Sequence, residues 1–358
     1  MKFLKVLPLV MVASLSACSR NRTNEMPLLI FDTEAYLTMR VDSHFVSHQT
    51  YNKTVDLLKE LDKISDAYKS RDQVTNIYSL NQTNDRLEIS KDLYDLLSKA
   101  NAAKESIKYF NPLMGSLSNK WKKALHPENE EEEPRQLTDE EIQAELTKIN
   151  SSSLVLESEN NKYYAQRVGD ALIDVGAIAK GFALDKCLSY FKHASTVKGD
   201  YLVDLGKSSI LLGINDNRPE TNGCGGFNPL HGTYSVQIED LRKVTIELRN
   251  CFLSTSGVSQ QGVVIDGTTY SHIVSPETGS VVNNYDAVIV VVPDTVEDGG
   301  FLSDALSTSF MMSTKEEIMA YEEKNSDISV IAIKDGNIDY MSENITLTKY
   351  NGNKIIKK

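Results

Sequence analysis

The chain has 358 residues and a formal net charge of −12, and hydrophobic and charged residues make up 41% and 25% of it. This balance is typical of a globular protein with one large domain or two smaller ones, and it argues against intrinsic disorder, a collagen and a polytopic membrane protein. Because an acidic protein repels a phosphate backbone, nucleic acid is not expected as a partner.

The N-terminus has the pattern of a secretory leader. Lys2 and Lys5 precede an apolar stretch, residues 6–15, which is too short to span a bilayer as a helix. The stretch ends in Leu15-Ser16-Ala17-Cys18, which matches the bacterial lipoprotein pattern, in which the cysteine becomes the lipidated first residue. An ordinary signal peptide followed by an unrelated cysteine is the alternative. We therefore expect residues 1–17 to be removed, and the exported protein to be anchored by lipid on Cys18 to a bacterial membrane, facing the periplasm or the cell exterior.

Three further cysteines are Cys187, Cys224 and Cys251. Three thiols cannot all pair, so a disulfide framework is excluded, while a single disulfide among them stays open. No CxxC or histidine-rich spacing indicates a zinc site.

In the first half of the chain, the apolar periodicity predicts mainly helices. Ser90 and Thr138 have the positions of helix N-caps, the second within a capping-box pattern. The acidic run at residues 128–133 is expected to be a solvated loop, with a metal-binding cluster as the alternative. The expected elements, in chain order, are a tether over residues 18–27, a strand over 28–40, helices over 51–68, 90–109 and 138–149, and strands over 154–157, 163–167 and 171–173.

In the second half, short strands alternate with helices without strict βαβ order, which indicates an α+β fold of mixed sheets with packed helices. The β-branched run at residues 287–292 predicts a buried strand. Residues 28–345 are expected to form the main body, as a single large domain or two subdomains, and residues 346–358 a C-terminal tail. The remaining expected elements are helices over 177–191, 301–312 and 315–324, strands over 201–205, 210–214, 233–238, 244–248, 287–292 and 328–333, and a loop over 215–232.

One segment that could form part of a functional site is Asp174-Val-Gly-Ala-Ile-Ala-Lys-Gly-Phe-Ala-Leu-Asp185. An expected strand ends just before it, small residues follow, and a helix begins. Exposed amides and the dipole at such a helix start favour a phosphate, and Lys180 adds a positive charge. A tight strand-to-helix turn with close packing is the alternative.

A second segment is the expected helix containing Asp304 and Thr308. Four residues apart, the two side chains share one face of the helix. The apolar residues spread around the helix, so it should be buried, and a buried carboxylate requires a partner. A hard cation with oxygen ligands is one partner, and backbone amides or hydroxyl groups are the other.

Two further segments are residues 270–279, which place His272 before a Pro-Glu-Thr-Gly turn, and residues 253–257, which carry hydroxyl groups. A histidine can act as a general base near neutral pH, although a structural role is the alternative.

In this order, the four segments resemble the FAD:protein FMN transferase family, the ApbE-type flavin transferases, which are often lipoproteins. The resemblance extends from about residue 30 to residue 340 and implies the family's α+β fold with two subdomains. The matching elements are Asp-x-Gly-x-x-Ala-Lys-Gly-Tyr-Ala-x-Asp (residues 174–185), Thr-Ser-Gly (255–257), His-Ile-x-x-Pro-x-Thr-Gly (272–279), Ala-Asp-Ala-x-x-Thr (303–308, with Ser303 in place of the first Ala) and Phe-Asp-Pro…Trp (Phe110-Asn111-Pro112 and Trp121). The chain departs from the family at Phe31-Asp32-Thr33, where Met-Gly-Thr is usual, and at Leu205-Gly206-Lys207, where Gly-Gly is usual.

The resemblance implies an enzyme that uses Mg²⁺, cuts the diphosphate of FAD, transfers FMN to a threonine hydroxyl of a target protein and releases AMP. It implies Mg²⁺ ligands from the Ala177 carbonyl, the Asp304 carboxylate and the Thr308 hydroxyl. His272 is the candidate base, and Lys180 is a candidate catalytic group that contacts phosphate. The implied contacts to the flavin, adenine or diphosphate are Phe31, Asn81, Asn111, Lys180, Thr255, Gly257 and Ile273.

Two other functions are compatible with these residues. In the first, water replaces the threonine as the attacking group, and the protein is a pyrophosphatase that gives FMN and AMP. In the second, it is a non-catalytic lipoprotein that binds FAD.

Overall fold

A computed structural model describes most of the chain beyond the leader. The described residues are 22–24, 27–41, 44–129, 131–194, 197–214, 227–228, 233–238, 244–258, 262–265, 268–351 and 354–357. Cys18 and Cys224 lie outside them. The helices are α1 (His44–Ser65), α2 (Ile77–Asn81), α3 (Lys91–Ser106), α4 (Gly115–Leu125), α5 (Asp139–Ser151), α6 (Ala179–His193), α7 (Gly299–Phe310) and α8 (Lys315–Lys324). The strands are β1 (Arg22–Asn24), β2 (Leu28–Ile30), β3 (Thr33–Val41), β4 (Leu87–Ile89), β5 (Ser153–Glu159), β6 (Lys162–Val168), β7 (Val197–Leu205), β8 (Ser209–Gly213), β9 (Phe227–Asn228), β10 (Thr233–Gln237), β11 (Val244–Leu248), β12 (Cys251–Gly257), β13 (Val263–Ile265), β14 (Thr268–Tyr270), β15 (Ala287–Pro293), β16 (Ser329–Lys334), β17 (Asn337–Met341), β18 (Leu347–Asn351) and β19 (Lys354–Lys357).

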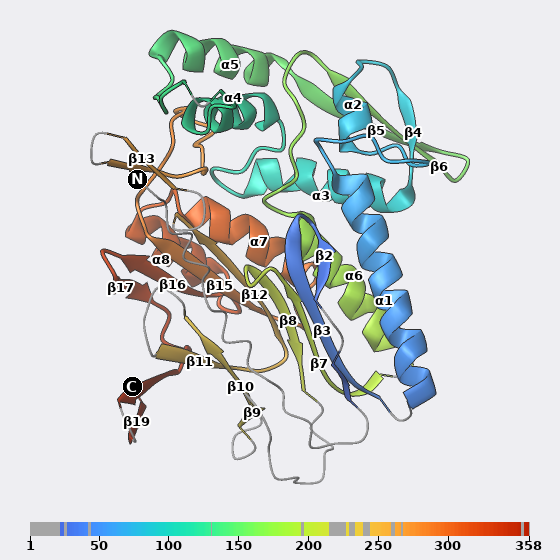
Figure 1. The fold of residues 1–358 in the computed structure, drawn as a ribbon, viewed down its shortest axis with the longest axis vertical. Coiled ribbons are helices and arrows are strands. Elements are labelled where there is room, and N and C mark those ends of the chain that lie inside the picture. Colours follow the sequence, from blue (N-terminus) through green and yellow to red (C-terminus); the bar gives the residue numbers. More distant parts are fainter. Residues whose placement is uncertain are drawn as a thin grey trace.

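The centre of the molecule is a nine-stranded antiparallel sheet (Figure 1). Its order is β1-β3-β7-β8-β12-β15-β16-β17, and β2 pairs with β3 as a short hairpin. Strand β15 shows that this sheet is buried on both faces. Val288, Val290 and Val292 contribute to one core, while Ile289 and Val291 contribute to another. The predicted buried strand at residues 287–292 is therefore confirmed, and its continuous apolar run follows from having a layer on each side.

Helices α6 and α7 cover one face of the large sheet, and they also pack against each other. The other face is covered by a second antiparallel sheet, β19-β18-β11-β10-β9. Leu347 of β18 is buried in the core between the two sheets, and β18 pairs with β11. The stretch at 346–358, which we expected to be a tail, thus supplies two strands.

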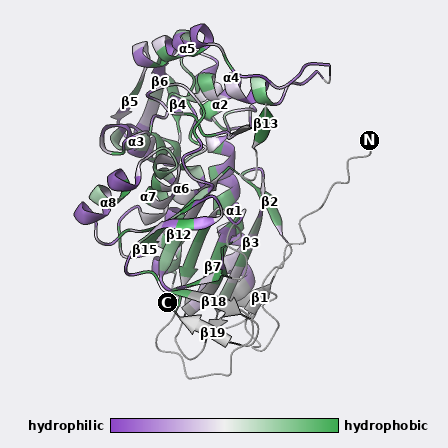
Figure 2. Ribbon diagram, turned by 90° about the vertical axis from the view of Figure 1, so that its left-hand side faces the viewer, coloured by the Kyte–Doolittle hydropathy of each residue, from purple (hydrophilic) through white to green (hydrophobic). Residues whose placement is uncertain are grey.

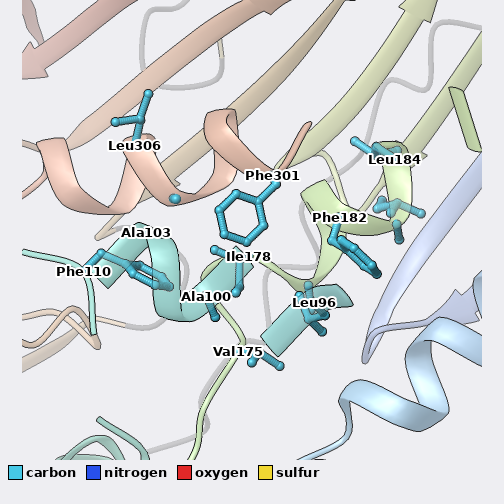
Figure 3. Packing of buried hydrophobic residues seen from close by; sticks show 14 of the residues in the cluster. Leu96, Ala100, Ala103, Phe110, Val175, Ile178, Phe182, Leu184, Phe301 and Leu306 are labelled. Atoms are coloured by element: carbon cyan, nitrogen blue, oxygen red, sulfur yellow. The ribbon is translucent and has the colours of Figure 1, made fainter. Parts of the chain in front are cut away.

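A smaller layer above the large sheet contains α2 to α5 and the three-stranded sheet β4-β6-β5 (Figure 1). It shares a core with α6 and α7, because Leu96, Ala100 and Ala103 of α3 face Phe301 and Phe182 (Figure 3). Figure 2 shows that hydrophobic residues concentrate in the strands of the large sheet, while α8 is mostly hydrophilic. One continuous core therefore joins the layer of α2 to α5 to the large sheet.

The predicted α+β fold of mixed elements is confirmed, as are the N-caps at Ser90 and Thr138. Several local predictions were wrong. Residues 22–24, expected to lie in a tether, form β1, and residues 227–228, expected to lie in a loop, form β9. Residues 28–40 form a hairpin rather than a single strand, since Phe31 and Asp32 both have positive φ angles, as a tight two-residue turn requires. Residues 171–173 are not in a strand, because their backbone bonds to loops and side chains instead of a sheet. Residues 328–333 were the last strand expected, but β17, β18 and β19 follow it.

Two of the cysteines, Cys187 and Cys251, are buried free thiols, so they do not form a disulfide with each other. In the part of the chain that is described, no helix is long and apolar enough to cross a membrane.

Candidate functional site

Asp304 lies in α7, and its carboxylate receives hydrogen bonds from three separate elements. The residue is 6% exposed. The Gly181 amide of α6 donates at 2.6 Å, the Ser209 hydroxyl of β8 at 2.7 Å and the Ser254 hydroxyl of β12 at 2.6 Å. Segments more than 120 residues apart in sequence therefore meet at one carboxylate.

Burial raises the pKa of Asp304, and the nearby charge of Lys180 and the three hydrogen bonds oppose that rise. The direct partners are neutral donors, so they leave the negative charge of the ionised group uncompensated. A buried charge of this kind is stabilised by a cation with oxygen ligands.

Two further oxygens lie on the elements that meet at Asp304. In a regular helix the Gly181 amide would donate to the Ala177 carbonyl, but here it donates to Asp304. Within the described ranges, no hydrogen bond ends on the Ala177 carbonyl. The Thr308 hydroxyl, one turn after Asp304, lies 3.1 Å from the Ser256 hydroxyl.

These donors fit Mg²⁺, which prefers carboxylate, carbonyl and hydroxyl oxygens, takes few protein ligands and is completed by substrate phosphates and water. The described residues contain no cluster of three or more His, Cys, Asp or Glu side chains that could hold a metal. A metal here would consequently depend on Asp304, on neutral oxygens and on the substrate.

Lys180 occupies the first turn of α6 and lies among the charged groups of the site. Its side chain donates a hydrogen bond to the Ser208 hydroxyl. Its positive charge adds to the effect of burial in lowering the pKa of His272. For Asp304 and Asp204 the same charge opposes burial, which raises the pKa of both carboxyl groups. The N-cap of α6 has no side-chain capping bond. An anion near Lys180 would therefore also meet the uncapped start of a 15-residue helix.

His272 follows β14 and has access to solvent. Its pKa is lowered, first because neighbouring atoms remove water from the ring and second because Lys180 is positive. A histidine with a pKa below its ordinary value is neutral at pH 7 and can accept a proton. Lys180 lies close enough to both His272 and Asp304 for its charge to lower their pKa values, so the structure brings the three residues together.

Thr255 and Gly257 lie on β12 beside this group. The Thr255 amide donates to the Ser208 carbonyl at 2.7 Å, which places Thr255 next to Ser208, the hydrogen-bond partner of Lys180. Gly257 pairs with Ala287, and a Cβ on Gly257 would lie 3.1 Å from the Asp286 carbonyl. Backbone packing at this point leaves little room for a side chain.

The other expected contact residues have structural bonds of their own. The Phe31 amide donates to Asp62 at 2.9 Å in the β2–β3 turn, while the Phe31 ring is partly exposed. Asn111 accepts a hydrogen bond from the Leu113 amide at 3.0 Å, within a local turn.

Asn81 and Ile273 lie further inside. The Asn81 amide donates to the Ile173 carbonyl at 2.9 Å and accepts from the Ile173 amide at 2.8 Å, and the residue is 9% exposed. Asn81 therefore supports the segment that leads into Asp174 and has little surface left for a ligand. Ile273 is also buried, so its side chain belongs to the core.

Our sequence reasoning missed two residues of the site, Ser209 and Ser254, which bind Asp304. It also did not mark Tyr68, a residue that is 52% exposed, lies close to the charges of Asp174 and Asp32, and has the Lys122 ammonium 4.9 Å from the centre of its ring. Loss of water around the ring and these carboxylates raise the pKa of Tyr68 to about 12. Ser254 and Ser256 are two residues apart on β12 and therefore lie on the same face of the strand. This spacing could have indicated Ser254 from the sequence. Nothing in the sequence marks Ser209 or Tyr68.

Comparisons with known proteins find relatives of this chain. The FAD:protein FMN transferase of Haemophilus influenzae is 22% identical over 304 residues, which cover 81% of this chain and 80% of that protein. The protein of the same name from Vibrio cholerae is 29% identical over 215 residues, or 57% of each chain, so the match spans just over half of that relative.

Solved structures share the fold. The ApbE protein of Thermotoga maritima superposes with a TM-score of 0.68 at 21% identity, over 90% of this chain and 96% of that one. The flavin transferase ApbE of Vibrio cholerae superposes with a TM-score of 0.64 at 22% identity, over 90% and 97%. The ApbE family matches residues 31–332, which include every motif around Asp304, Lys180 and His272, and the chain therefore belongs to the ApbE family.

Proposed function

We propose that this protein transfers FMN from FAD to a threonine hydroxyl of an acceptor protein and releases AMP. The observation that carries the proposal is the buried Asp304 carboxylate, which three neutral donors hold and which takes the Gly181 amide from the Ala177 carbonyl, with Lys180 and His272 nearby. The names of the relatives, FAD:protein FMN transferase, support the same reaction class.

The residues would divide the chemistry as follows. His272, neutral at pH 7, accepts the proton of the attacking hydroxyl. The hydroxyl oxygen forms a bond to the phosphorus of the FMN half, the bond from that phosphorus to the bridging oxygen breaks, and AMP leaves with that oxygen. Lys180 and the start of α6 stabilise the negative charge of the diphosphate.

Mg²⁺ would be held by the Ala177 carbonyl, Asp304 and Thr308, and would neutralise charge on the diphosphate. Binding of FAD also involves, in this proposal, Phe31 and Asn111 at the surface, Thr255 and Gly257 on β12, and the exposed ring of Tyr68. The ring offers an aromatic surface on which a flat heterocycle could stack.

We further propose that the protein works outside the cytoplasm, attached to a bacterial membrane by lipid on Cys18. The lipoprotein pattern at residues 15–18 supports this location. The acceptor would then be a protein, or a protein domain, on the same side of the membrane.

The test replaces Asp304 by Asn and by Ala. Both variants should lose Mg²⁺-dependent AMP release from FAD by at least about a hundredfold, because the only carboxylate among the proposed ligands is gone. Mg²⁺ should raise the melting temperature of the unchanged protein with FAD and leave that of the Asp304→Asn protein unaltered. Full Mg²⁺-dependent turnover by Asp304→Asn would refute the metal assignment.

The same assay separates the proposed reaction from the two others. With an acceptor that offers a threonine, mass spectrometry should find covalently bound FMN on the acceptor. Free FMN and AMP in equal amounts, with no flavin on the acceptor, would identify a pyrophosphatase. Binding of FAD without cleavage would identify a carrier.

A further inference from the structure

The loop that carries His272 is closed by its own hydrogen bonds. The Val282 amide donates to the Ile273 carbonyl at 3.0 Å, and the Ser275 amide donates to the Ser280 carbonyl at 2.9 Å. The Gly279 amide donates to the Ser275 carbonyl at 2.8 Å. Residues 273–282 therefore form a compact, internally bonded hairpin, with His272 at its base.

Besides the buried side chains of Ile273 and Val274, the hairpin is attached to the rest of the protein at Gly279. Gly279 has a φ angle of +70°, and a Cβ there would lie 2.4 Å from Ile142 of α5, so its backbone presses against that helix. The Gly279 carbonyl accepts a hydrogen bond from the indole of Trp121 in α4 at 2.8 Å. Trp121 is 3% exposed, so this bond is shielded from water. A buried carbonyl that loses its donor is left unsatisfied, which destabilises the arrangement that depends on it.

Helix α4 also holds the opposite side of the site. The Gly115 amide at its start donates to the Leu172 carbonyl at 2.9 Å, and the Pro112 carbonyl accepts from the Asp174 amide at 2.8 Å. These bonds tie α4 to the segment that leads into α6 and Lys180. A single rigid helix thus connects the hairpin that bears His272 with the turn that bears Lys180.

We propose that Trp121 is a positioning residue, whose indole N–H fixes the His272 hairpin at its working distance from Lys180 and the Ala177 turn. The inference rests on the proposed function, because it assigns Trp121 a part in that reaction. Within the described residues, the indole N–H of Trp121 bonds to the Gly279 carbonyl and to none of the groups assigned to the reaction, so its loss should lower kcat while KM for FAD changes little.

Because the chain has one tryptophan, incorporation of a tryptophan analogue changes the indole N–H of Trp121 and no other residue. Biosynthetic incorporation of β-(3-benzothienyl)alanine exchanges the indole N–H for sulfur and keeps the shape of the ring. Protein carrying 4-fluorotryptophan, which retains the N–H, is the matched control. The variant Trp121→Phe provides an independent removal of the donor.

With the benzothienyl side chain, kcat for FMN transfer should fall about tenfold or more, and KM for FAD should stay within about twofold. Backbone amide exchange at Gly279 and Val282 should rise about tenfold, while exchange in β15 stays unchanged. The 4-fluorotryptophan protein should behave like the unmodified one in both measurements.

An unchanged kcat in the benzothienyl protein would overturn the inference. Equal acceleration of exchange in β15 would also overturn it, because Trp121 would then be only a residue of the core. If the unmodified protein transfers no FMN at all, the proposed function fails, and the exchange measurement still decides whether the indole N–H holds the hairpin.

Discussion

Gly181 and Gly300 touch through their backbones. A Cβ on Gly181 would lie 2.0 Å from the Gly300 carbonyl oxygen, and a Cβ on Gly300 would lie 2.3 Å from the Gly181 carbonyl oxygen. Helices α6 and α7 therefore pack more closely than any other pair of residue types would allow here. This contact permits the Gly181 amide to reach Asp304 at 2.6 Å.

Replacing Gly300 by alanine should destabilise the protein and also impair the site. An alanine inside a helix gains about 1 kcal/mol in helix propensity, but the overlap here is with backbone, which cannot rotate away. We expect a net loss of about 2 kcal/mol in the free energy of unfolding, measured by urea titration. The helices must separate, so Mg²⁺-dependent AMP release should fall about tenfold at temperatures where the variant is folded.

Ser189→Ala provides the control, because Ser189 lies on the exposed side of α6. It should leave both quantities nearly unaltered. A Gly300→Ala protein with unchanged stability and activity would show that α6 and α7 can move apart without consequence for Asp304.

The sequence predicted the parts of the site that depend on local geometry. Asp304 and Thr308 share a face because of helical spacing, and the small residues before Lys180 mark a helix start. Ser209 could not be found this way. Its contact with Asp304 spans 95 residues and depends on β8 lying beside β12, which is a matter of strand pairing. No local pattern specifies which strands pair.

The same limit explains the errors in the fold. Residues 171–173 have an apolar pattern typical of a strand, but their partners are the Asn81 amide and loop backbone. Residues 346–358 were expected to be a C-terminal tail. Leu347 nevertheless becomes part of the core, because β18 pairs with β11 on the far face of the large sheet.

Truncation after residue 345 should therefore cost stability. Leu347 is buried, and its loss alone removes about 2 kcal/mol of hydrophobic stabilisation, to which the β18–β11 hydrogen bonds add. We expect a clear fall in melting temperature by calorimetry. Truncation after residue 351 removes β19, which among the described strands pairs with β18 alone, and should have a smaller effect. If the chain truncated after residue 345 has the same melting temperature as the full-length protein, the second sheet does not stabilise the large one through β18.

The charge of Lys180 should be measurable in the titration of His272. Both causes on this ring, loss of water and the Lys180 charge, act against protonation, so its pKa lies below the ordinary 6.5. His272 is then protonated only in acid, and the rate of FMN transfer should stay high down to a pH below 6.5 before it declines. Replacing Lys180 by Gln removes one cause and leaves the other, so the pKa of His272 should rise while staying below 6.5. Proton NMR of the ring, assigned by comparison with His272→Gln, measures this without substrate. A value that does not move in Lys180→Gln would show that Lys180 and His272 do not share a site, and the division of labour between them would have to be abandoned.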